Sequence, residues 1–398
     1  MFLHAFFFII FTMNKNRMII FCLRIIPFIV NPDISLIGLN LPYWVFIAAG
    51  FIIAFIITWI SIPTIVKISK FKKLYGILNE RTSHVDETPN LGGLAVFAGF
   101  VITAVIFSIK TESEEIKYII GGIIVLFFTG LKDDILVIDP KKKLLGQIIA
   151  ASIIVIFGNI RITSFYNTFG VEEISYILSV LFTLFLVVVL INGYNLIDGV
   201  DGLASGTGIF ASLAFGIWFI VTKHTTYAVL CLSLAGSLIA FFRFNVFGRG
   251  NKIFLGDTGS LIAGLLVAVF TIKFLEFQQS APMKYQLHSA PAVAFALLIS
   301  PLFDTARVFI LRIFNGGSPF KADRKHLHHS LLALGNSHLK VTVIMLSCNI
   351  LFVLLAAAIQ KIGNVLSIII LILLAVTVSF LPQTIIKLRK KKSIISTG

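Results

Sequence analysis

Long, unbroken blocks of leucine, isoleucine, valine and phenylalanine recur along this 398-residue chain, separated by short polar stretches. The blocks do not alternate between apolar and polar residues in steps of two. They are therefore typical of lipid-embedded helices and not of the strands of a membrane barrel. Because roughly 20 apolar residues cross the hydrocarbon core, the pattern predicts an all-α integral membrane protein, a polytopic bundle of about 11 transmembrane helices. The predicted helices cover residues 42–66, 91–109, 116–131, 144–158, 175–192, 206–222, 225–242, 258–275, 290–311, 341–360 and 364–386.

Composition supports the membrane assignment. The chain is 58% hydrophobic and 13% charged, with a mean hydropathy of +0.99, which excludes an ordinary soluble domain. Its three cysteines, Cys22, Cys231 and Cys348, lie far apart in apolar stretches without CxxC spacing. We therefore expect small buried side chains and no disulfide framework or zinc site.

The formal charge of +15 is distributed unevenly between alternate loops. One set of loops, with the C-terminal tail, is rich in lysine and arginine, whereas the other set carries few of them beside several glutamates. By the positive-inside rule the basic set is cytoplasmic. The excess charge therefore indicates membrane orientation, and we expect no nucleic-acid partner.

Three regions follow from this reading. Residues 1–40 contain two apolar runs that are each too short to span, so we leave this extension unassigned. It is an interfacial segment, a signal-like extension or the product of an upstream start codon. Residues 41–390 form the transmembrane domain, and residues 391–398 form a basic cytoplasmic tail.

Aspartates gather on one predicted face of the membrane, whereas the acids of the outer loops are glutamates. This asymmetry predicts a single site at the cytoplasmic boundary, built from several helix ends and active-site loops. The aspartates concerned are Asp86, Asp133, Asp134, Asp139, Asp198, Asp201, Asp257, Asp304 and Asp323.

Two of these segments suggest a metal. Asp133 and Asp134 are adjacent, and their mutual repulsion in a partly buried place is relieved by a hard divalent cation such as Mg²⁺. The alternative is a solvated pair of loop acids. Asp257 is another candidate metal ligand. Alternatively, it is the N-cap of the following helix, with Thr258 or Ser260 satisfying amides of the first turn.

Asparagine and aspartate recur at intervals of three in the glycine-rich segment 192–206. The spacing places Asn192, Asn195 and Asp198 near one face of a helix end, and glycines such as Gly199 let backbone amides approach a ligand closely. A merely polar helix terminus is the alternative reading.

A later loop concentrates cations and imidazoles: Arg324, Lys325, His326, His328 and His329. The histidines do not have the i, i+4 spacing of a helical zinc pair. They resemble an anion clamp that donates N–H groups to a pyrophosphate or a sugar. The alternative is a solvated basic loop. Acids for a metal and cations for phosphates together indicate phosphoryl chemistry on a substrate that is half lipid.

Five motifs in this order resemble the polyprenyl-phosphate N-acetylhexosamine-1-phosphate transferases of glycosyltransferase family 4, over about residues 42 to 386. The motifs are Arg81-Thr-Ser-His84 with Thr88-Pro89 and Gly92-Gly93; Lys132-Asp133-Asp134 with Lys143-Leu-Leu-Gly-Gln147; Asn192 to Gly202; Phe254 to Ser260; and Ser318-Pro-Phe-Lys-Ala-Asp323-Arg-Lys-His326-Leu-His-His329. The last one resembles the GlcNAc-type branch. Thr82 departs from the family, which commonly has lysine there.

The resemblance implies transfer of a sugar-1-phosphate from a UDP-sugar to polyprenyl phosphate, with release of UMP and a need for Mg²⁺ or Mn²⁺. It implies a multi-pass protein of the bacterial inner membrane with its active site in the cytoplasm. It also implies that Asp257 is a metal ligand, and that Asp133 and Asp134 activate the lipid phosphate and help to hold the cation. Asp198 and the three histidines, His326, His328 and His329, are the other expected catalytic residues. The expected substrate-binding residues are Arg81, His84, Lys143, Asn192, Asn195, Gly199, Asp201, Phe254 and Arg324.

Two alternatives to this function remain at this stage. Within the family, the chain could be the phospho-MurNAc-pentapeptide translocase of peptidoglycan synthesis. From another class, a membrane transporter with an acidic ion site also carries intramembrane carboxylates, although these should lie near the midplane of the membrane. The sequence does not decide which UDP-sugar is used, which glycan is begun, or whether a homodimer forms.

Overall fold

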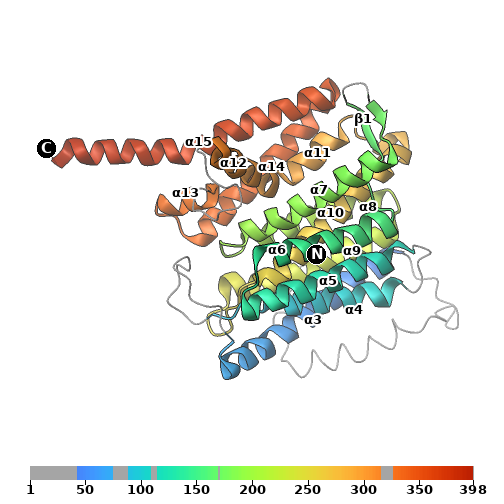
Figure 1. Ribbon diagram of the computed structural model, residues 1–398, viewed down its shortest axis with the longest axis horizontal. Helices are drawn as coiled ribbons and strands as arrows, with labels where there is room; N and C mark the ends of the chain where they lie inside the picture. Colours follow the sequence, from blue (N-terminus) through green and yellow to red (C-terminus); the bar gives the residue numbers. More distant parts are fainter. Residues whose placement is uncertain (1–42, 75–87, 109–113, 169–170, 315–325, 398) are drawn as a thin grey trace.

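The computed structural model describes residues 43–74, 88–108, 114–168, 171–314 and 326–397, which are almost entirely helical (Figure 1). The helices are α3 (Tyr43–Lys72), α4 (Gly92–Ser108), α5 (Glu115–Leu136), α6 (Pro140–Ser152) with a π-helical turn (Ile153–Phe157), α7 (Tyr176–Ile197), α8 (Leu203–Val221), α9 (Thr225–Phe247), α10 (Gly256–Ser280), α11 (Ala290–Leu297), α12 (Ile299–Phe314), α13 (Leu327–Ala333), α14 (His338–Ile359) and α15 (Asn364–Thr397). Short 3-10 turns lie at Met283–Tyr285 and Gln360–Ile362.

Each predicted span coincides with a helix or with two consecutive helices. Seven helices in the described part of the chain are long and apolar enough to cross a membrane. An eighth crossing is added if the helices of the bent pair around α11 and α12, which meet at 62°, count as one. The chain is therefore a polytopic, mainly helical membrane protein with seven or eight candidate spans. The number eleven is not confirmed, because α4 and α6 are short and α5 carries charged residues near both ends.

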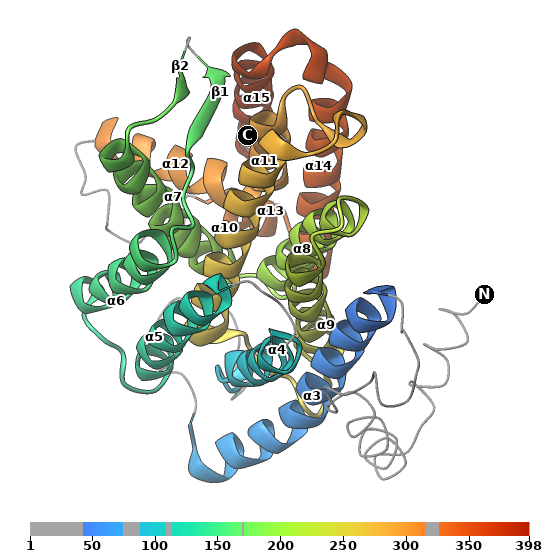
Figure 2. The ribbon, with the colours of Figure 1, turned by 90° about the vertical axis from the view of Figure 1, so that its right-hand side faces the viewer.

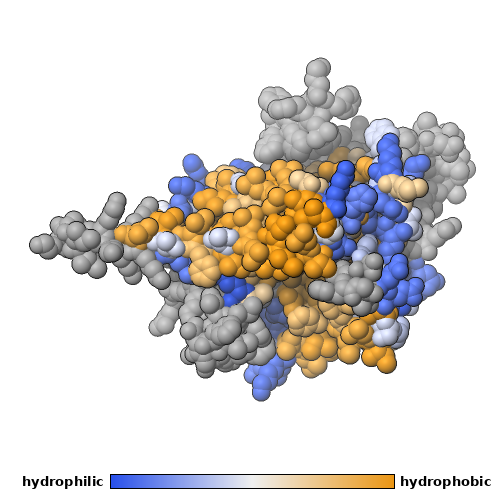
Figure 3. Space-filling model, turned by 90° about the horizontal axis from the view of Figure 1, so that it is seen from above, coloured by the Kyte–Doolittle hydropathy of each residue, from blue (hydrophilic) through white to orange (hydrophobic). Residues whose placement is uncertain are grey.

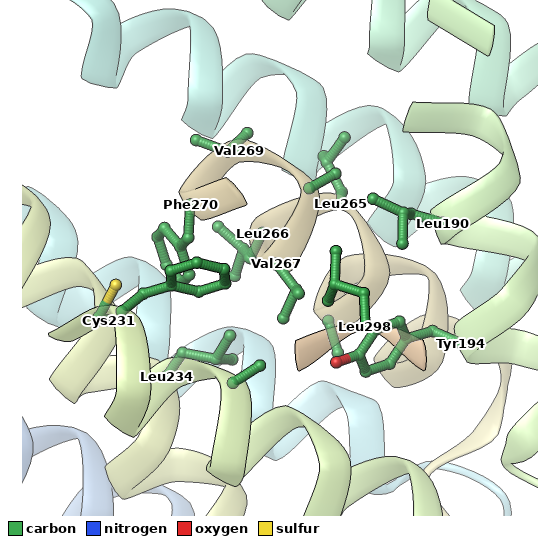
Figure 4. Packing of buried hydrophobic residues seen from close by; sticks show 14 of the residues in the cluster. Leu190, Tyr194, Cys231, Leu234, Leu265, Leu266, Val267, Val269, Phe270 and Leu298 are labelled. Atoms are coloured by element: carbon green, nitrogen blue, oxygen red, sulfur yellow. The ribbon is translucent and has the colours of Figure 1, made fainter. Parts of the chain in front are cut away.

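Helix α10 lies in the middle of the bundle (Figure 2). It packs against α4, α5, α7 and α8, and nearly all of its apolar side chains are buried. Leu265 and Phe270 of this helix pack in one cluster with Leu190 and Tyr194 of α7 and Leu234 of α9 (Figure 4). A helix that is apolar all round can be enclosed by other helices on every side in this way. Its N-terminus is therefore held firmly at one end of the bundle.

The surface also fits a membrane. Seen from above, apolar residues cover the middle of the visible face, and hydrophilic residues gather toward the right-hand side (Figure 3). Large apolar side chains such as Phe128, Phe185 and Leu351 are more than half exposed. Exposure on this scale indicates contact with lipid.

A polar cluster lies near the C-terminal end of α10, whereas Asp257 lies at the N-terminal end of the same helix. The ammonium of Lys273, which is 2% exposed, lies 2.9 Å from a carboxylate oxygen of Glu115 on α5 and 2.8 Å from one of Glu276. Tyr227 of α9 donates its hydroxyl hydrogen to Glu115. This buried lysine therefore ties α10 to α5 by an ion pair.

A short antiparallel hairpin corrects the all-helical prediction. Strand β1 (Ser164–Thr168) pairs with β2 (Val171–Glu173) between the π-helical turn and α7. The strands have five and three residues. A segment this short gives too few alternating positions for a two-residue period to be recognised.

Several predictions concern residues outside the described ranges: the extension 1–40, Arg81, His84, Arg324 and Cys22. The other two cysteines are free, as expected, and one of them is buried. Helix α15 continues to Thr397, through most of the predicted C-terminal tail.

Candidate active site

Three helix ends meet at one end of the bundle: the C-termini of α5 and α7 and the N-terminus of α10. Close packing of α5 on α10 depends on Gly130, where an added Cβ would lie 2.5 Å from the Cα of Thr258. No side chain larger than hydrogen fits in this space. Asp133 and Asp134, in the last turn of α5, therefore lie next to the first turn of α10, which carries Asp257.

The ammonium of Lys143, from the first turn of α6, lies among these helix ends. Its Nζ is 2.5 Å from Oδ2 of Asp257, 3.1 Å from Oδ2 of Asp133 and 3.3 Å from Oδ1 of Asn195. Only 16% of the lysine side chain is exposed. Four residues from four helices thus converge, and a single cation faces two carboxylates.

Asn195 fixes the other oxygen of Asp257. Its amide Nδ2 donates to Oδ1 of Asp257 and to Oγ of Ser260, the latter at 3.0 Å. The amide lies in the last turn of α7. The predicted polar face of the segment 192–206 therefore reaches the carboxylates through Asn195.

Asp134 has a different set of contacts from its neighbour. Its carboxylate accepts hydrogen bonds from the backbone N–H of Asp257 at 2.7 Å and from both the N–H and the hydroxyl of Thr258, at 3.0 and 2.6 Å. It therefore caps the N-terminus of α10 from another helix, a place that favours negative charge. Burial, with the nearby charge of Asp257, raises the pKa of Asp134 to about 7, so the carboxyl group is only partly ionised at neutral pH. The N-cap position, Leu255, has no capping side chain, so the reading of Asp257 as an N-cap is wrong.

Asp133 is turned toward the lysine instead. Its Oδ1 accepts the N–H of Ile138 at 2.8 Å, while Oδ2 faces Lys143 and Asp257. The two adjacent aspartates thus differ in position: Asp133 faces the centre of the site, and Asp134 caps the N-terminus of α10.

Asp198 lies directly after the last residue of α7. Burial raises the pKa of this carboxyl group well above its usual range, and the nearby charges of Asp257, Asp134 and Asp201 raise it further. Among the described residues, Lys143 is the cation that contacts Asp133 and Asp257, and it does not balance these two carboxylates together with Asp134 and Asp198, which favours binding of an additional cation.

Other predicted residues lie around this centre. Asn192, about one helical turn before Asn195 on α7, donates to Gln147 of α6 at 2.6 Å and accepts from it at 3.2 Å. Asp201 pairs with Lys252 at 2.8 Å, and the Lys252 ammonium lies 5.4 Å from the centre of the Phe254 ring. Sequence reasoning missed Lys252, although its position two residues before Phe254 was a usable signal.

The histidine segment lies beside the end of α7. A Cβ added to Gly199 would be 3.8 Å from Nε2 of His328, and the ring centres of His328 and His329 are 4.4 Å apart. His326 and His328 are both buried. The structure thus brings residues from the two predicted motifs together, as the sequence anticipated.

The carboxylates of the site are the candidate ligands for a metal ion. In the described ranges, no three His, Cys, Asp or Glu side chains surround one point. However, the carboxyl groups of Asp133 and Asp257 are close enough to share a hydrogen bond. Magnesium commonly uses one or two protein carboxylates and completes its octahedron with water and substrate phosphates. The residues present fit such an ion.

Comparison with known proteins identifies a family and similar proteins. Residues 116–275 match the model of the family described as glycosyl transferase family 4. A decaprenyl-phosphate N-acetylglucosaminephosphotransferase of Mycolicibacterium smegmatis is 32% identical over 289 residues, 67% of this chain and 70% of that protein. The protein of that name from Mycobacterium leprae is 34% identical over 288 residues, covering 67% and 72%.

A third relative comes from another bacterial group. The undecaprenyl-phosphate alpha-N-acetylglucosaminyl 1-phosphate transferase of Escherichia coli O157:H7 is 29% identical over 278 residues, 68% of this chain and 72% of that protein. The family match, residues 116–275, includes all three helix ends that build the site. The chain belongs to glycosyl transferase family 4.

Proposed function

We propose that this membrane protein transfers GlcNAc-1-phosphate from UDP-GlcNAc to a polyprenyl phosphate, giving a polyprenyl-diphospho-GlcNAc and UMP. The observation that carries the proposal is the convergence of Asp133, Asp257, Asn195 and Lys143 at three helix ends. It occurs in a family whose relatives are named for this transfer.

In the reaction, an oxygen of the lipid phosphate attacks the β-phosphorus of the UDP-sugar. The bond from that phosphorus to the bridging oxygen breaks, and UMP leaves with the electron pair. Because the second pKa of a phosphate monoester is about 6, the attacking oxygen is largely anionic at neutral pH. The protein therefore needs to cancel repulsion between two anions more than to remove a proton.

The residues of the site have separate parts in this proposal. Lys143 leaves its carboxylate partners to donate to phosphate oxygens, and Asn195 orients Asp257. The histidines contact the diphosphate. Asp133 and Asp257 would hold Mg²⁺, or Mn²⁺, and the bound ion supplies charge neutralisation on the phosphates.

A second polar group serves the nucleotide. Asp201, Lys252 and Phe254 lie together beside the carboxylates, with an aromatic face and hydrogen-bonding groups of the kind that a uridine needs. We assign them to uridine binding. Gly199 lets the diphosphate approach the backbone closely.

We further propose the orientation and the remaining architecture. The loops that carry the site face the cytoplasm, because their side of the chain is rich in lysine and arginine, and all eleven apolar segments cross the inner membrane. Residues 41–390 constitute the catalytic domain in this scheme.

The test uses membranes that contain the chain, undecaprenyl phosphate and a panel of UDP-sugars, followed by mass measurement of the lipid products. UMP release that depends on lipid and Mg²⁺ is expected, with UDP-GlcNAc preferred. Asp257→Asn and Asp133→Asn should each abolish transfer in protein that is still inserted. Turnover retained by either variant would overturn that residue's assignment, and a MurNAc-pentapeptide product would identify the peptidoglycan translocase instead.

A further inference from the structure

Asp304 is a buried carboxylate to which the transfer reaction assigns no role. It lies on α12, is 3% exposed, and carries a negative charge into the packed region between α12 and α13. Burying a carboxylate is costly unless it is paired and hydrogen-bonded. Its partners therefore indicate what the charge does.

Those partners belong mostly to the histidine segment. Oδ2 of Asp304 is 3.1 Å from Nδ1 of His326 and 3.6 Å from Nδ1 of His328. Oδ1 accepts the backbone N–H of Leu327 at 2.9 Å and is 3.8 Å from Nη1 of Arg307. One carboxylate thus contacts two imidazoles and the backbone between them.

This arrangement determines how the rings are oriented. A carboxylate only accepts hydrogen bonds, so the Nδ1 of His326 must carry a proton, and its other nitrogen, Nε2, is turned away from Asp304. In His328, Nε2 points toward Gly199, beside Asp198. His328 is fully buried, and neither of its ring nitrogens has a hydrogen-bond partner within bonding distance. A buried imidazole without such a partner, directed at the end of α7, is suited to a ligand.

We propose that Asp304 is a positioning residue, which holds His326 and His328 so that their Nε2–H groups donate to the diphosphate of the bound substrate. The inference rests on the proposed function. His326 would then donate from Nδ1 to Asp304 and from Nε2 to a phosphate oxygen, whereas His328, whose Nδ1 lies 3.6 Å from Asp304, would donate from Nε2 to the phosphate. Carboxylates that orient histidines in this way commonly contribute 10- to 100-fold, as metal sites illustrate.

The test is a double-mutant cycle between Asp304 and His326, with UMP release as the readout. Asp304→Asn should lower kcat by roughly 10- to 100-fold in the native background. In the His326→Ala background the same change should lower kcat by a smaller factor, because only the effect of Asp304 on His328 remains. An equal loss in both backgrounds, or no loss in either, would overturn the proposal.

Two further variants separate positioning from folding. Thr305→Val is the matched control, because it changes the neighbouring residue of α12 with little change in shape, and should leave the rate unchanged. Asp304→Glu keeps the charge but moves it by one methylene. If Asp304→Asn does not fold, the same cycle with Asp304→Glu should show the same dependence on His326, and its absence would overturn the proposal.

A measurement independent of turnover distinguishes this proposal from the function on which it rests. Hydrogen–deuterium exchange of peptides covering Leu327–Ala333 should accelerate in Asp304→Ala but not in Thr305→Val, because the Leu327 N–H loses its acceptor. If native protein releases no UMP from any UDP-sugar while exchange behaves as expected, the proposed function fails and the contact itself stands. Unchanged exchange would show that Asp304 does not position the segment.

Discussion

The contact between Asp134 and the first turn of α10 can be tested by replacing this aspartate with asparagine. In the native chain, its carboxylate accepts three hydrogen bonds from Asp257 and Thr258. Asparagine keeps one acceptor oxygen and turns an amide NH₂ toward at least one of these donors. Losing one charge-assisted bond costs roughly 1.5–3 kcal/mol, and losing the anion at the helix N-terminus costs a further ~0.3–1 kcal/mol. Asp134→Asn should therefore lower the free energy of unfolding by roughly 2–4 kcal/mol.

Two measurements on purified protein in detergent check this reasoning. The melting temperature should fall, whereas kcat for UMP release should change much less, because Lys143 and Asn195 still hold the carboxylate of Asp257. The Mg²⁺ concentration for half-maximal rate should stay close to the native value if Asp134 acts as a cap. Asp139→Asn is the control, since Asp139 caps α6 from an exposed position by accepting the N–H of Lys141. An unchanged melting temperature with a greatly increased Mg²⁺ requirement would refute the capping role and make Asp134 a direct metal ligand.

Three further outcomes are expected. Gly93→Ala should lower the free energy of unfolding by roughly 1–3 kcal/mol, because the added Cβ would meet the backbone of α10. Gly250→Ala is the control, since an added Cβ there meets open space. Equal melting temperatures of the two variants would contradict the packing of Gly93 on α10. Lys273→Met should lower the free energy of unfolding by roughly 2–4 kcal/mol, because two partly exposed glutamates lose their ion-pair partner, and it should also lower kcat in the folded protein, because α10 is no longer fastened to α5 at that end. Burial and neighbouring carboxylates raise the pKa of Asp198, so in chelator-treated protein the stability falls as the pH rises above about 4. Asp198→Asn should then melt higher than the native chain at mildly alkaline pH and equally in acid, and a lower melting temperature at alkaline pH would contradict the charge excess.

Much of the bundle could be predicted from apolar blocks because lipid imposes a simple rule on length and composition. All eleven predicted segments are helical. Their capacity to span is a separate property, and α5 shows the difference, since its C-terminal end carries the aspartates of the site and its N-terminal end carries Glu115. The β1–β2 hairpin was missed because its stability depends on packing outside its own short sequence.

Among the described residues, the sequence indicated which polar side chains lie together better than it indicated their individual contacts. Asparagine and aspartate at helix ends identified Asn195 and Asp257, and both meet at one place. The sequence could not separate Asp133 from Asp134, because adjacent residues on a helix point about 100° apart and only the packed neighbour decides which one faces the centre. The contacts of Asp304 with His326 and Leu327 were equally hidden, since these partners lie more than 20 residues away in the sequence.

The buried lysine at the far end of α10 has a consequence for catalysis at the near end. Asp257 and Lys273 are 16 residues apart on one helix, which corresponds to a rise of roughly 24 Å. The same two helices, α5 and α10, are fastened at both ends, by Asp134 at one and by Glu115 at the other. Neither helix can slide along its partner without breaking both attachments at once. The position of the Asp257 carboxylate along the bundle is thus set partly by the ion pair at the opposite end. A change in the charge of Lys273 or Glu115 would therefore shift Asp257 relative to the bound nucleotide.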